Sequence, residues 1–69
     1  MSRHQALEVL RRVRGEATAD VLAALMSEAA PNEPHVTPRA AARILGRLVQ
    51  AGLAVRYTRP DGLVVFRAR

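Results

Sequence analysis

The spacing of the apolar residues changes at Gly52, and this change does most to restrict the possible folds of the chain. Before Gly52, apolar side chains recur at intervals of three and four residues, as they do on one face of an α-helix. After Gly52, apolar residues alternate with other residues through 53–58, which is typical of a half-buried β-strand. The sequence therefore predicts an α+β chain in which helices come first and strands follow.

Three helices are predicted, each with an apolar stripe and suitable end residues. Ser2 and Gln5 fit a capping box at the start of the first helix, and Gly15 suits a left-handed stop at its end. Thr18 and Thr37 fit the N-cap positions of the second and third helices. The predicted ranges are about 3–14, 19–29 and 38–51. The expected core residues are Ala6, Leu7, Val9, Leu10 and Val13, then Val21, Leu22, Leu25, Met26 and Ala29, then Ala41, Ile44, Leu45, Leu48 and Val49.

A C-terminal two-stranded β-hairpin is predicted over about residues 53–68. Its turn is the segment RPDG at 59–62, in which Pro60 presets φ and Gly62 supplies a positive φ. The first strand should be half-buried through its alternating apolar residues, which are Leu53, Val55 and Tyr57. In the returning run, one of two alternating pairs should face outward and suit a partner; the pairs are Leu63 with Val65 and Val64 with Phe66.

The chain has 69 residues, enough for one small domain over residues 1–69. It contains no cysteine, which excludes a disulfide, a thiolate zinc site and a cysteine nucleophile. No apolar run approaches the roughly 20 residues that span a bilayer, and the first residues lack a signal-peptide pattern. We therefore expect a cytoplasmic protein with no membrane partner.

The net charge indicates a polyanionic partner. Eleven arginines and no lysine face six acidic residues, which gives a net charge of +5 and a pI near 11.6. A domain this basic usually binds nucleic acid, or less often an anionic membrane surface. The exclusive use of arginine fits the recognition of phosphate and guanine. The alternative explanation is the codon preference of a GC-rich genome, and we give it more weight because alanine is also abundant.

The predicted third helix carries an arginine at every fourth position, Arg39, Arg43 and Arg47, opposite its apolar stripe. These side chains span about 12 Å along the helix axis, a length that fits the major groove of DNA. No acidic residue lies between 37 and 52, although like charges four residues apart repel by a few tenths of a kcal/mol. This single sign of charge favours an anionic partner over a merely solvated face, which usually mixes signs.

Three other residues of this helix region have more than one interpretation. Thr37 either contacts a phosphate at the helix start or acts only as the N-cap. Gln50, near the helix end, contacts the DNA backbone or solvent. Gly46 permits a close approach to DNA, packs closely against a neighbouring helix, or reflects drift.

The predicted hairpin carries Arg56 and Arg59 beside its turn and Arg67 on its returning strand. In the functional interpretation, Arg56 or Arg59 reaches the minor groove or a phosphate, and Arg67 is a further candidate DNA-binding residue. In the alternative interpretation, they only protect an edge strand from pairing with another chain.

A family resemblance is carried by the segment TPRAAARILGRLVQAGLAVRYTRPDGLVVFRAR, residues 37–69. In this segment a basic helix is followed by the residues AGL, which lead from the helix into the first strand, and then by a hairpin. Two other helices precede the segment. This pattern resembles the winged helix-turn-helix domains of bacterial regulators of the multiple-antibiotic-resistance and arsenic-repressor kinds. The resemblance implies a three-helix core with helix 38–51 in the major groove and the 56–67 hairpin as a wing. The connection between the second and third helices is about eight residues, longer than the usual 3–4.

No enzymatic site, metal site or cofactor is expected. The acidic residues are scattered without paired-carboxylate spacing, and the chain has no glycine-rich phosphate loop. His4 and His35 are far apart in the sequence and belong to no HExxH pattern.

The leading interpretation is a double-stranded DNA-binding protein, a small transcriptional regulator that gains affinity as a homodimer. Candidate dimer surfaces are the helix 3–14, the loop 29–36, and Leu63 with Val65. The alternative is a winged-helix protein-interaction module, or an accessory subunit of another protein, that does not itself bind DNA. RNA binding is a third interpretation, for which only two aromatic residues offer stacking platforms.

Overall fold

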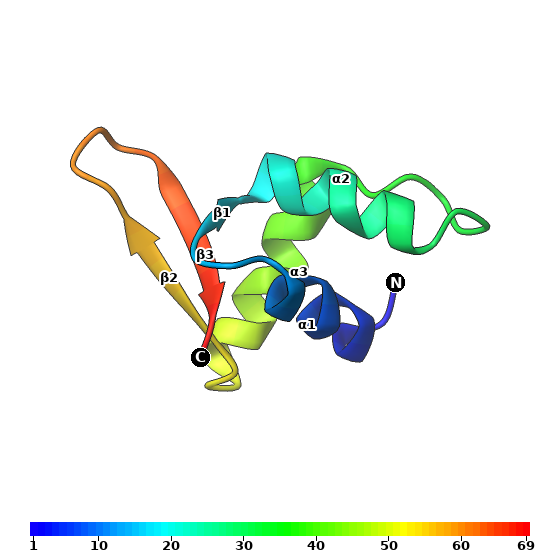
Figure 1. The fold of residues 1–69 in the computed structure, drawn as a ribbon, viewed down its shortest axis with the longest axis horizontal. Coiled ribbons are helices and arrows are strands. Elements are labelled where there is room, and N and C mark those ends of the chain that lie inside the picture. The colour runs from blue at the N-terminus through cyan, green and yellow to red at the C-terminus, as the bar shows by residue number, and fades with distance from the viewer.

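The computed structural model describes residues 1–69 as three helices and a three-stranded antiparallel sheet, an α+β arrangement. The elements in chain order are α1 (Arg3–Arg12), β1 (Ala17–Thr18), α2 (Ala19–Ala29), α3 (Pro38–Gln50), β2 (Ala54–Thr58) and β3 (Val64–Ala68). The helices lie together on one side of the sheet, and the turn between β2 and β3 extends away from them (Figure 1). The longest dimension of the molecule is 37 Å.

The sheet has the strand order β1–β3–β2, so β3 is its central strand. Phe66 of β3 pairs with Ala17 on one side and with Arg56 on the other, while Val65 pairs with Thr18 of β1. The sequence prediction of two strands was therefore incomplete. Two residues are too few to show an alternating pattern, and β1 is defined by its pairing with β3 rather than by its own sequence.

The predicted capping residues begin all three helices. Ser2 and Gln5 form both hydrogen bonds of the capping box. The hydroxyls of Thr18 and Thr37 each accept a hydrogen bond from the amide three residues later. The bounds of α2 agree with the prediction, and α3 ends one residue earlier than predicted.

The helix α1 ends at Arg12, two residues earlier than predicted, and Gly15 is not its immediate stop. Val13 is already extended, with φ −80° and ψ 124°, and its side chain packs against the core. Gly15 adopts a φ of 86° in the turn that follows. Because Val is β-branched, it accepts the extended conformation readily, and this conformation turns the chain toward β1.

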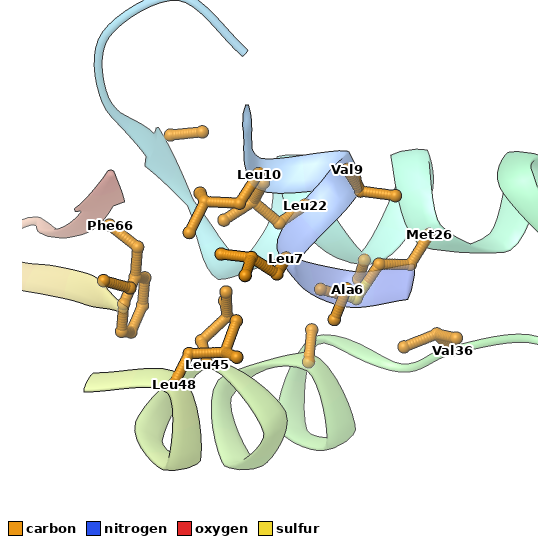
Figure 2. Close-up of a cluster of buried hydrophobic side chains, with 14 residues drawn as sticks. Ala6, Leu7, Val9, Leu10, Leu22, Met26, Val36, Leu45, Leu48 and Phe66 are labelled. Atoms are coloured by element: carbon orange, nitrogen blue, oxygen red, sulfur yellow. The ribbon is translucent and has the colours of Figure 1, made fainter. Parts of the chain in front are cut away.

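The core is formed by apolar side chains from all three helices and from the sheet. Figure 2 shows Leu7, Leu22 and Leu45 converging between the helices, with Phe66 entering from β3 and Val36 from the α2–α3 connection. Each large aliphatic side chain that is fully buried contributes roughly 1.5–3 kcal/mol to folding. The stripes predicted for α1 and α3 are confirmed, since every residue in them is buried or half-buried.

The stripe predicted for α2 was partly wrong. Leu22 and Met26 are buried as expected, but Val21 is 51% exposed and Ala29 is also exposed. Ala23 is buried instead. The helix contacts both α1 and α3, so its buried face extends to position 23 rather than to position 21.

The first strand after Gly52 also buries a different residue from those predicted. Val55 is half-buried as predicted, but Ala54 is the buried residue of β2, and Leu53 and Tyr57 are 38% and 50% exposed. Ala54 lies opposite Ala68 and on the same sheet face as Phe66. The aromatic ring of Phe66 fills the space between sheet and helices, so small neighbours on that face are sufficient (Figure 2).

The returning strand does not expose either of the alternating pairs that were considered. Val65 and Phe66 are both buried, whereas Leu63 and Val64 are 43% and 40% exposed. The reason is position along the central strand: Val65 and Phe66 have β1 on one side and β2 on the other. Leu63 and Val64 lie beyond the end of β1, toward the turn. Val65 is therefore not available as part of a dimer surface.

The eight residues between Ala29 and Pro38 are held by one serine of α2. The Ser27 hydroxyl donates to the carbonyl of Ala23 at 2.9 Å and accepts from the amide of Val36 at 3.0 Å. Val36 is buried, so its amide needs this partner. The bond fixes the end of the connection immediately before α3.

None of the three helices is both long enough and apolar enough to cross a membrane.

Candidate nucleic-acid interface

The end of α3 determines how the following strand is placed. Gly52 adopts a φ of 76°, its amide donates to the carbonyl of Val49, and the amide of Leu53 donates to the carbonyl of Leu48. These two bonds define a Schellman motif, in which a left-handed residue ends the helix and reverses the chain. The strand β2 consequently begins beside the last turns of α3 and packs against that helix.

The outward face of α3 is cationic and unneutralised. Arg39, Arg43 and Arg47 are all exposed, because Leu45 and Leu48 fix the opposite face of the helix in the core. The structure contains two ion pairs, and neither includes an arginine of α3. The acceptor nearest in sequence to this helix, Glu33, is instead bonded to the N-terminal ammonium at 2.7 Å.

An open groove of about 320 Å³ lies between α3 and β2. Its lining is Ala42, Arg43, Gly46, Arg47, Val49, Gln50 and Arg56. Three of these seven residues are arginines, and none is acidic. The groove therefore brings together cationic side chains from two elements that are separate in the sequence.

Four of the eight residues selected from the sequence meet in this groove: Arg43, Arg47, Gln50 and Arg56. Arg39 lies one helical turn before Arg43 and is exposed, outside the groove lining. Thr37 caps the helix, accepting from the amide of Ala40 at 3.1 Å.

The remaining two residues, Arg59 and Arg67, do not line this groove. Arg59 is in the β2–β3 turn, and its Nη2 atom lies 3.9 Å from Oε1 of Glu16. Arg67 pairs with Val55 and so projects from the sheet face opposite to that of Phe66 and the helices. The structure thus separates Arg67 from the groove.

The β2–β3 turn has the local bonds that its sequence suggested. Gly62 adopts a φ of 89°, and its amide donates to the carbonyl of Arg59 at 2.9 Å. The carboxylate of Asp61 accepts from the amide of Leu63 at 3.0 Å. These bonds hold Arg59 at the start of a compact turn.

Gly46, for which the sequence allowed three explanations, lines this groove. A methyl group built on its α-carbon would meet no atom within 4 Å, so close packing against a neighbouring helix is not the reason for the glycine. A glycine inside a helix costs about 1 kcal/mol relative to alanine. Its cost and its central position in the outward stripe were visible in the sequence, but the groove around it was not.

No group of three or more His, Cys, Asp or Glu side chains is placed to hold a metal ion. No protein-family model, curated protein or solved structure matches the chain significantly.

Proposed function

We propose that this chain is a winged helix-turn-helix protein that binds double-stranded DNA, with α3 in the major groove and the β2–β3 hairpin as the wing. The order of elements supports this arrangement: three helices, with β1 before α2, and β2 and β3 after α3. The antiparallel order β1–β3–β2 and the Schellman exit from α3 set the hairpin beside that helix. Such a protein would act as a small transcriptional regulator.

The observation that carries the proposal is the set of three unpaired guanidinium groups on α3. They lie at every fourth position on one exposed face, over about 12 Å of helix, and none of them forms an ion pair in the structure. Phosphate contacts would relieve the mutual repulsion of the arginines, and a bidentate hydrogen bond from one of them to guanine would give sequence preference. Arg39 and Arg43 lie in the first half of the helix, the half that usually reaches base edges, where a guanidinium group fits either a guanine edge or a phosphate.

The test is a titration of duplex DNA with the wild-type protein and with Arg43→Ala and Arg12→Ala. Both substitutions remove one positive charge, but Arg12 lines a different groove, between α1 and α2. We expect Arg43→Ala to weaken binding by about tenfold or more, because a specific arginine contact is worth roughly 1–3 kcal/mol. Arg12→Ala should have a much smaller effect.

Circular dichroism and thermal unfolding should show both variants folded, because neither arginine is buried. Equal affinity of Arg43→Ala and wild type would remove α3 from the interface. A second experiment, selection of bound duplexes from a random pool, gives the sequence preference of the wild-type protein. A consensus with dyad symmetry would indicate a homodimer on DNA.

A second candidate function, a winged-helix module that binds protein, is favoured by one observation. The end of the sheet near the turn exposes Tyr57, Leu63 and Val64, each by 40% or more. The register puts Tyr57 and Val64 on opposite faces of the sheet, and exposed apolar side chains at this end suit another protein subunit or a second copy of the chain. This candidate is distinguished by co-purification of a partner and by no retardation of duplex DNA at physiological salt.

A further inference from the structure

We infer that the groove between α3 and β2 holds a phosphate of the DNA backbone, and that Gly46 is a glycine so that this phosphate can approach the helix closely. The inference rests on the proposed DNA binding and adds a site and a ligand group to it. Gly46 acts in it as a positioning residue, because it lets the phosphate reach the surrounding donors.

The geometry gives Gly46 no role within the folded chain. Its φ is not positive, so an alanine would be accepted by the backbone, and the space above it is open. Alanine would also stabilise the helix. The open space is instead part of the groove, and any side chain at position 46 would project into it.

The charge of the groove favours a phosphate over a base. Arg43 and Arg47 lie one turn apart on α3, and Arg56 faces them from β2. A guanine edge accepts one guanidinium fork, whereas a phosphate carries a full negative charge and several acceptor oxygens. Three arginines without an acidic residue are therefore better matched to a phosphate, with the Gln50 amide as an additional donor.

The experiment compares Gly46→Ala and Gly46→Leu with wild type, using several duplexes of unrelated sequence at a series of salt concentrations. Ala51→Leu is the control, because Ala51 is exposed at the end of the same helix but does not line the groove. We expect Gly46→Ala to raise Tm by about 3–6 °C and yet to bind DNA more weakly. Gly46→Leu should bind every duplex about tenfold more weakly, with a log–log salt slope smaller by about 1, whereas Ala51→Leu should bind normally.

Three other results would each overturn the inference, in distinguishable ways. If Gly46→Leu kept the affinity and salt slope of wild type while Arg43→Ala still bound DNA more weakly, α3 would remain the DNA-binding helix. The groove would then be excluded as a phosphate site. A loss confined to duplexes with one particular base would assign the groove to a base edge. No binding of duplex DNA by the wild-type protein would overturn this inference together with the proposed function.

Discussion

Arg56 of β2 lies opposite Phe66 of β3, so the two side chains share the sheet face that the helices cover. Phe66, on the central strand, is buried in the core, whereas Arg56, on the edge strand β2, is exposed and lines the groove beside α3. The register that buries the aromatic ring therefore also directs this arginine toward the arginines of α3. Arg67, one position after Phe66, points to the other side of the sheet.

This register makes Arg56 and Arg67 a matched pair for testing the orientation of the hairpin. We expect Arg56→Ala to weaken duplex binding by about three- to tenfold, through the loss of a contact in the groove. Arg67→Ala removes the same charge from the opposite face and should change the affinity by less than about twofold. Fluorescence anisotropy with a labelled duplex measures both, and the reverse order would place the other face of the sheet against DNA.

The contact between Glu16 and Arg59 restrains an arginine of the turn, at a nitrogen–oxygen distance of 3.9 Å. Glu16→Gln should free Arg59 for phosphate and raise the affinity for duplex DNA about two- to threefold at low salt. Glu8→Gln changes the net charge equally and is the control, since Glu8 forms no ion pair in the structure. An equal rise in both variants would mean that net charge alone is responsible.

Ser27 is expected to be the main support of the connection before α3. Ser27→Ala should lower the free energy of unfolding by about 1–3 kcal/mol, because it leaves the buried amide of Val36 without an acceptor. Asn32→Ala, in the same connection, should change it by less than about 0.5 kcal/mol, since Asn32 is exposed and its side chain forms no hydrogen bond. Urea unfolding of the two variants measures the difference.

Two glycine-to-alanine substitutions, one within α3 and one just after its C-cap, should change stability in opposite directions. Gly52→Ala should destabilise the protein by about 1–2 kcal/mol, because alanine resists the φ of 76° that the Schellman motif requires. The added methyl would lie 3.8 Å from the Arg69 guanidinium, an ordinary contact, so the cost is conformational. Gly46→Ala should stabilise it by about 0.5–1 kcal/mol. Thermal unfolding measures the direction of both stability changes. Destabilisation by Gly46→Ala would contradict the finding that the space around the Gly46 α-carbon is open.

The helices could be predicted from the sequence because their signals are local. Thr37, Pro38 and Gly52 mark the two ends of α3 by capping chemistry, and its stripe of Leu45 and Leu48 fixes the rotation that exposes the arginines. The sheet could not be predicted to the same degree because its signals are not local. The strand β1 exists through its pairing with β3, and the burial of Val65 follows from its central position between two strands.

The candidate site also has one part that could be predicted from local sequence and one part that could not. The cationic face of α3 follows from spacing along one helix and was visible in the sequence. The groove depends on which face of β2 is turned toward α3, and the sequence pattern suggested the wrong buried face, with Leu53 and Tyr57 in place of Ala54. The separation of Arg56 from Arg67, and the presence of Arg56 in the same groove as Arg43 and Gly46, required the register of the sheet.

The most direct test of DNA binding is the affinity of the wild-type protein for duplex DNA as a function of salt concentration. Contacts from α3 and the hairpin to about five phosphates predict a log–log slope near −4 to −5. Arg43→Ala should bind more weakly at every salt concentration. A slope near zero, or no binding of duplex DNA even at about 50 mM salt, would contradict the account.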